Sequence, residues 1–181
     1  MISYNFYVDW DCTNWSDAPD FSQPDDDITS YVKKYSIERG KNQELGNALA
    51  GTLDLTLNNT SRDFTPTNVI GKFYSTIRLW LPILMTATIG EDEPQIFYLG
   101  FISEIKIDPH PQAVEAYFYC TDGMDLLARQ LITQDPDNLQ AMSDGTAINQ
   151  ILDAAGWSAD NRNIDMDGGD TLLEYPTTYP Y

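Results

Sequence analysis

Histidine, cysteine and basic residues are scarce in this chain. Its 181 residues include one histidine, two cysteines and ten lysines and arginines, against 28 acids, for a formal net charge of -18. Nucleic-acid binding depends on basic patches, and attraction to anionic membranes needs basic segments, so this charge balance argues against both functions. Two interpretations of the acidic charge stay open. It keeps the protein in solution, or it lines a channel through which DNA passes, since acidic side chains repel phosphates at short range.

Long apolar runs are also missing. No run approaches the roughly 18 apolar residues that a membrane span needs. The first residues, MISYNFYVDWD, lack the basic start and apolar core of a signal peptide. Cys12 and Cys120 are far apart and lack metal-ligand spacing, so we expect reduced thiols rather than a disulfide scaffold. Together these absences predict a soluble protein made in a cytoplasm.

Alternating apolar and polar residues predict most of the secondary structure. In the clearest case Leu53, Leu55 and Leu57 alternate with polar residues, which is typical of a half-buried strand. Further strands are expected over residues 3–10, 28–40 (beginning at 28–32), 75–85 with a continuation at 86–89, 95–108 and 113–120, with a hairpin turn at 90–94. Pro82 should lie at an edge, a bulge or a strand end, and Gly100 at a bulge or sharp bend.

Two short helices are predicted near the end of the chain. Asp122 is a candidate N-cap for the first helix, which has Met124, Leu127, Ala128 and Leu131 at helical spacing. The second is expected over residues 145–155, with Asp144 as its cap and Gly156 as its C′ residue. Its expected apolar face consists of Ile148, Ile151 and Leu152.

Six to eight strands joined mostly by short turns, followed by two helices, predict a mainly β protein. We expect a β-barrel or a sandwich of antiparallel strands with two short helices, α+β by strict count. Residues 1–157 are assigned to this domain. Residues 158–181 are polar and then rich in proline and tyrosine, and are interpreted as a tail or a linker to a further domain.

Three features of the sequence are candidate sites. Acidic and hydroxyl residues in the loop Asp9–Asp20 have a calcium-loop spacing, but Asn14 stands where such a loop needs glycine. The stretch Asp160–Asp170 is acidic and contains glycine, and is interpreted as a surface loop. His110 is the only histidine and therefore the only histidine that is a candidate general base. It lies between two prolines in a predicted turn, and the sequence nominates no nucleophile near it.

The sequence therefore nominates no catalytic, cofactor-binding or metal-binding residue. One other feature is an aromatic series, in which alternate members should face inward to the core and outward to a protein interface. It comprises Phe97, Tyr98, Phe101, Tyr117, Phe118 and Tyr119.

Several short motifs share their order and spacing with a known family. They are Arg39-Gly40, Ala50-Gly51-Thr52, the leucines of the strand that follows, Asn59, and Phe64-Thr65-Pro66-Thr67-Asn68. This block resembles the opening of tail-tip or baseplate hub proteins of long-tailed bacteriophages. The likeness continues through Phe97–Ile102, Thr121–Leu127 and Ile148–Trp157. The chain departs from the family at 58–61, where the usual turn carries Asp-Gly, and at 12–14, where the family is often richer in glycine.

The resemblance implies a structural protein rather than an enzyme. Proteins of this group form rings of three or six copies that join the tail tube to a central spike or fibre and let DNA pass. Their fold is a β-barrel with a helical insertion. The implied partners are copies of the chain itself and other tail proteins (tube, spike or fibre, tape measure), with DNA only in passage, no membrane insertion and no cofactor. The implied location is the virion tail, assembled in the host bacterial cytoplasm.

Two other functions remain open from the sequence. One is a carbohydrate-binding β-sandwich module for host-surface recognition, in which exposed tryptophan and tyrosine stack on sugars. The other is a cell-wall hydrolase module that uses carboxylates, although acids are so abundant that any pair can be proposed.

Overall fold

The computed structural model describes residues 2–14, 16–38, 50–108, 114–129 and 143–157, and the single positions Ala159 and Ile164. The chain divides into two compact units, Met1–Trp15 with Pro19–Ala128 and Ser16–Ala18 with Arg129–Tyr181. This division precedes the second helix, whereas the sequence led us to place a boundary after it, at residue 157.

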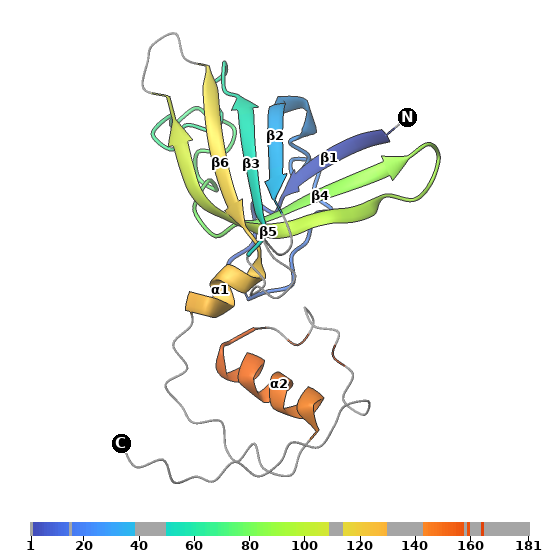
Figure 1. Cartoon of the computed structure of the whole chain (residues 1–181). Helices are drawn as coiled ribbons and strands as arrows, with labels where there is room; N and C mark the ends of the chain where they lie inside the picture. Colours follow the sequence, from blue (N-terminus) through green and yellow to red (C-terminus); the bar gives the residue numbers. More distant parts are fainter. Residues whose placement is uncertain are drawn as a thin grey trace. The chain divides into compact units, whose positions relative to one another are not determined.

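The described residues form six strands, all in the first unit and in one sheet (Figure 1). The strands are β1 (Ile2–Val8), β2 (Val32–Glu38), β3 (Thr52–Asn58), β4 (Pro82–Ile89), β5 (Gln95–Ile107) and β6 (Glu115–Thr121). Their order is β1-β4-β5-β6-β3-β2, and every neighbouring pair is antiparallel. The prediction of a mainly β, antiparallel fold with two short helices is confirmed.

The sheet curls so that β1, at one edge, meets the segment that leads into β2, at the other edge. The Val8 N–H donates to the Asp26 carbonyl at 2.9 Å, and the Ile28 N–H donates to the Phe6 carbonyl at 2.9 Å. An isolated bridge joins Tyr7 to Asp27 between them. The architecture is therefore one curled, barrel-like sheet and not the two packed sheets of a sandwich.

The expected strand beginning at residues 28–32 was wrong. Residues Thr29–Tyr31 form a single 3-10 turn, η1, and β2 begins at Val32. The reason is local turn chemistry, since the Thr29 N–H donates to the Asp27 side chain at 2.8 Å and the Tyr31 N–H to the Ile28 carbonyl at 2.9 Å. The turn redirects the chain from its bonds with β1 to its pairing with β3.

The core lies inside this curled sheet. The three leucines of β3 are buried, as their alternation predicted, and Phe118 of β6 is fully buried beside them in the same cluster. Phe64 and Phe73 enter the core from the long connection between β3 and β4. Their rings stack 5.1 Å apart, and Phe73 stacks at 4.1 Å on Trp10, which follows β1.

That connection contains a run of consecutive turns, which we call the serial-turn loop (residues 59–77). Backbone N–H groups bond to carbonyls three residues earlier, at intervals of three: Arg62 to Asn59, Thr65 to Arg62, Asn68 to Thr65, Gly71 to Asn68 and Tyr74 to Gly71. The strand predicted from residue 75 was therefore wrong, because β4 begins only at Pro82. Pro82 stands at the strand end, where its missing N–H costs no ladder bond, as expected.

β5 bends where the sequence indicated. The pairing register of β5 shifts before and after Gly100. The shift against β4 lies at Met85 and Thr86 of β4, and the shift against β6 lies between Ile102 and Glu104 of β5. A Cβ atom at Gly100 would lie 2.5 Å from the Thr121 carbonyl oxygen, so only glycine allows this approach of β5 to β6. The strand curves strongly in Figure 1.

The first helix, α1 (Gly123–Arg129), has the predicted cap. One carboxylate oxygen of Asp122 accepts the Met124 N–H at 3.0 Å, and the other accepts the Gly51 N–H at 2.6 Å. Asp122 therefore links the start of the helix to the start of β3. Leu131, expected on the apolar face of this helix, lies outside the described residues.

The second helix, α2 (Asp144–Ala154), begins one residue earlier than expected, with Ser143 rather than Asp144 as its cap. The Ser143 hydroxyl accepts the Thr146 N–H at 3.3 Å, which satisfies one of the unpaired N–H groups of the first turn. The buried positions of α2 are Gly145 and Ala147, whereas Ile148 and Ile151 of the expected apolar face are exposed. Gly156 follows the helix with φ of 76° as predicted.

Candidate functional site

The candidate calcium loop is organised by one carboxylate. Asp9 is buried, and its Oδ1 accepts the N–H groups of Asp11 and Cys12 at 3.1 and 2.9 Å. Its Oδ2 accepts the Asp20 N–H at 2.9 Å. Both oxygens therefore bind backbone groups and fold the loop. Within the described ranges, no group of three or more His, Cys, Asp or Glu is placed to hold a metal ion.

Asp26 is a second buried carboxylate near this loop, which the sequence did not single out. Its Oδ2 accepts the Gln23 N–H at 2.9 Å, and its own carbonyl bonds to β1. Burial raises the pKa of Asp26, and the negative charge of Asp9 adds to that rise, while the backbone N–H groups of Gln23 and Trp10 oppose it. Ionisation of Asp26, which bonds to β1 where the sheet closes, therefore lowers the stability of the folded protein.

The other sequence candidates divide into two groups. His110 and the stretch 160–170 lie outside the described residues. Cys12 and Cys120 are both buried, and they do not form a disulfide. The Cys12 thiol donates to the Asn14 carbonyl at 3.0 Å, and burial raises the pKa of Cys120 far above its ordinary value. Neither thiol has the exposure of a reactive cysteine.

The aromatic series splits into inward and outward halves, as predicted. Tyr98, Phe101 and Phe118 are buried. Phe97 is exposed, and Tyr117 and Tyr119 are half-buried on the outer face of the sheet. Whether the outward residues bind a partner stays a prediction.

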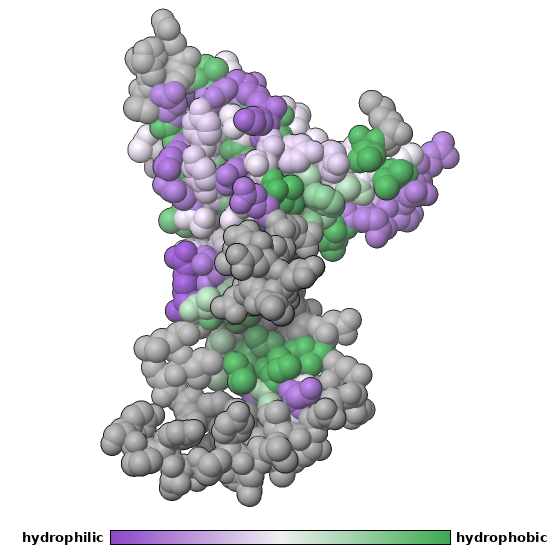
Figure 2. Space-filling view, viewed as in Figure 1, coloured by the Kyte–Doolittle hydropathy of each residue, from purple (hydrophilic) through white to green (hydrophobic). Residues whose placement is uncertain are grey.

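Among the residues that the structure describes, the largest group of exposed apolar side chains lies on an arm formed by the start of β1, the end of β4 and the start of β5. Ile2 pairs with Ile89 across β1 and β4, and the exposed fractions of the two side chains are 54% and 61%. Ile96 and Leu99 of β5 are 69% and 45% exposed. Figure 2 shows hydrophobic residues on this arm and hydrophilic residues at its tip.

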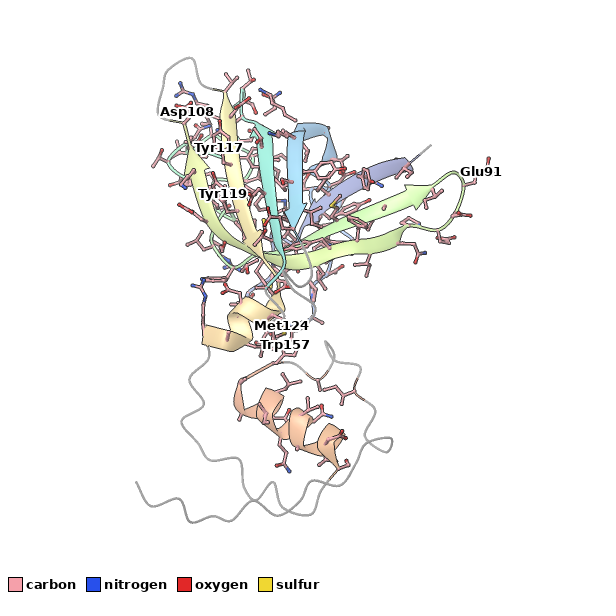
Figure 3. The ribbon with its side chains drawn as sticks, viewed as in Figure 1. Glu91, Asp108, Tyr117, Tyr119, Met124 and Trp157 are labelled. Atoms are coloured by element: carbon pink, nitrogen blue, oxygen red, sulfur yellow. The ribbon has the colours of Figure 1, made fainter. Side chains whose placement is uncertain are left out.

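Both faces of the arm are exposed at its outer end. Residues 95–97 are consecutively exposed, although successive side chains of a strand point to opposite faces. The arm therefore extends beyond the core, ending in the acidic turn at Glu91 (Figure 3). By the pairing registers of β1, β4 and β5, Ile2 and Ile89 lie on one face of the arm, and Ile96 and Leu99 lie on the other. Exposed apolar groups of this kind mark interaction surfaces in soluble proteins.

The arm also presents an open strand edge. The outer edge of β1 bonds to the 26–29 segment only at Phe6, Tyr7 and Val8. Among the described residues, no strand pairs with residues 2–5 on that side. An open edge beside apolar side chains can receive a strand from another chain. The sequence missed this surface because an apolar run such as IFYL reads as a buried strand.

The residues behind the family resemblance serve packing in this structure. Asn59 is buried; its Oδ1 accepts the Phe64 N–H at 3.0 Å, and its Nδ2 donates to the Thr65 hydroxyl at 3.0 Å. The Asn68 side chain donates to the Arg62 carbonyl at 3.0 Å. These bonds hold the serial-turn loop so that Phe64 enters the core. Arg39 and Gly40 lie outside the described residues.

A scan of the chain against protein-family models found no match, and a search among curated proteins found no similar sequence. Among the described residues, no helix has the length and hydropathy to cross a membrane.

Proposed function

We propose that this chain is a structural component of a bacteriophage tail tip or baseplate, with a hub-like, non-catalytic role. Copies of the chain associate into a ring, of three or six by analogy with the proteins it resembles. The ring joins the tail tube to a central spike or fibre in the virion, assembles in the host cytoplasm, and forms part of the conduit for DNA. Tube, spike or fibre and tape-measure proteins are its proposed neighbours.

The observation that carries this proposal is the exposed apolar arm with its open β1 edge. A monomer gains nothing from exposing Ile2, Ile89 and Ile96 on a projecting arm, because each pays the cost of hydration. Packing the arm on a neighbouring copy removes this apolar area from water. The curled, barrel-like sheet agrees with the fold that the resemblance implies.

Charge supports the conduit part of the proposal. The segment 9–27, between β1 and η1, contains seven aspartates and no lysine or arginine. We expect this segment to face the lumen of the ring, where it repels phosphates. An image of the assembled ring in which the segment faces outward would refute the conduit, although it would leave the ring intact.

The test of association uses two matched substitutions. Ile96→Glu places a charge on the arm, whereas Ile70→Glu places it on the serial-turn loop, where Ile70 is 89% exposed. Burying an isoleucine contributes about 1.5–3 kcal/mol, so Ile96→Glu should weaken association about tenfold or more. Sedimentation velocity of the full chain measures this, with Ile70→Glu behaving like the wild type. Equal association of both variants and the wild type would exclude the arm as the interface.

A further inference from the structure

A shallow hollow lies on the outer face of the β5–β6 pair, away from the arm. It has a volume of about 330 Å³, and is lined by Lys106, Ile107, Asp108, Tyr117 and Tyr119. Figure 3 shows Asp108, Tyr117 and Tyr119 together along this end of the two strands. Small-molecule sites commonly occupy about 300–1,000 Å³ and combine apolar walls with a few polar groups. The hollow has both features at the small end of that range.

Two tyrosines form the aromatic wall. Tyr117 and Tyr119 alternate along β6 with buried residues, so both side chains extend to the outer face, from backbone positions about 7 Å apart along the strand. The Lys106 ammonium lies 4.6 Å from the centroid of the Tyr119 ring and 3.2 Å from the Glu104 carboxylate. Cation–π attraction and the ion pair together favour this position of the lysine.

The other ring is also held in place. The Tyr117 hydroxyl donates to the Glu115 carboxylate at 2.8 Å, and Glu115 accepts from Lys33 at 3.1 Å. These bonds lower the pKa of Glu115, with the Tyr117 hydrogen bond as the larger cause. Because both rings are already oriented, a ligand that stacks on them loses less conformational freedom on binding.

We propose that this hollow binds a neutral oligosaccharide. The C–H faces of a sugar ring pack on tyrosine rings, and its hydroxyl groups donate to a carboxylate such as Asp108 and accept from an ammonium such as Lys106. The hollow itself carries one charge of each sign, and the chain carries a net charge of -18, which disfavours an anionic glycan. A neutral sugar uses the aromatic wall without meeting that repulsion.

The test measures binding of three neutral probes, cellohexaose, maltohexaose and chitohexaose, to the full chain by saturation-transfer NMR and calorimetry. We expect saturable binding of at least one probe. Tyr119→Ala should weaken it about two- to tenfold, since an aromatic contact of this kind contributes about 0.5–1.5 kcal/mol. Tyr119→Phe, which keeps the ring, should bind like the wild type.

Tyr74→Ala is the matched control, because Tyr74 is an exposed tyrosine on the serial-turn loop and far from the hollow in sequence. It should leave binding unchanged, and unchanged circular dichroism should verify that each variant is folded. Three outcomes overturn the proposal: no saturable binding of any probe, binding that Tyr119→Ala leaves intact, or selective binding of a proline-rich peptide at these tyrosines. None of them bears on ring assembly, which the arm variants test separately.

Discussion

Replacing Gly100 with alanine should destabilise the first unit by a steric mechanism. The added Cβ would lie 2.5 Å from the Thr121 carbonyl oxygen, 2.6 Å from the Tyr98 hydroxyl and 2.7 Å from Tyr98 Cε1. The nearest of these atoms belongs to the backbone of β6, which cannot rotate away as a side chain can. The strand must therefore separate from β6, or Tyr98 must leave its buried position.

The expected cost follows from measurements on overpacked cores. Adding a methyl group to a well-packed interior costs about 1–3 kcal/mol, and occasionally more. For a chain of this size, each kcal/mol lowers the melting temperature by roughly 2–4 °C, so a decrease of roughly 2–12 °C is expected. Urea denaturation monitored by circular dichroism measures the free energy of unfolding directly.

Two comparisons separate the steric clash from other causes of destabilisation in Gly100→Ala. Gly90 has φ of 63° and nothing near its added Cβ, so Gly90→Ala costs only the left-handed backbone, about 1–2 kcal/mol. A double-mutant cycle between Gly100→Ala and Tyr98→Ala should give a favourable coupling of about 0.5–3 kcal/mol, because removing the Tyr98 ring relieves part of the clash. A free energy of unfolding for Gly100→Ala equal to that of the wild type would refute the close approach of β5 and β6.

Three further predictions concern the loops. Asp26→Asn removes the ionisation of residue 26. Because the folded pKa of Asp26 is raised above its ordinary 3.8, the wild type loses stability as pH rises above that value. The stability of the variant relative to the wild type should therefore increase from about pH 4 to neutral pH in thermal melts. A difference that is constant with pH contradicts this. Asn59→Ala leaves the buried Phe64 N–H unpaired and should cost about 1–3 kcal/mol in urea denaturation, while Asn59→Asp, which keeps the acceptor, should cost less. Calcium should not raise the melting temperature, since Asp9 is committed to three backbone groups; a calcium-dependent increase would show that the loop rearranges around the ion.

Local periodicity predicted the parts of the fold that depend on neighbouring residues. The leucines of β3 alternate with polar residues, and the structure buries them. Asp122 and Gly156 act at the ends of their helices as their chemistry indicates. Gly100 marked the bend in β5, because glycine within a long strand is unfavourable unless a close approach requires it.

Non-local contacts explain what the sequence did not predict. Ile77 and Leu81 resemble a continuing strand, but Ile77 ends the serial-turn loop and is only partly buried against the core. Leu81 is buried just before β4, and Leu79 between these positions is exposed. Closure of the sheet depends on bonds between Phe6 and Ile28, 22 residues apart, which no local pattern encodes.

The exposed arm was likewise not predicted as a whole, and the hollow on β5 and β6 was predicted only as far as outward-facing aromatic residues at an interface. The apolar residues of the arm have the composition of a core strand, and only the three-dimensional structure places them beyond the core. The alternation predicted that either Phe118 or its neighbours Tyr117 and Tyr119 face outward, but it did not decide between them. The position of Lys106 over Tyr119 depends on the pairing of β5 with β6, which the sequence did not establish.

The mass of the full chain in solution, measured by light scattering over a series of concentrations, tests the proposed ring assembly most directly. We predict a species of three or six times the mass of one chain, which Ile96→Glu shifts toward the single chain while Ile70→Glu does not. A single-chain mass at every concentration, identical in the wild type and both variants, would contradict self-assembly through the arm.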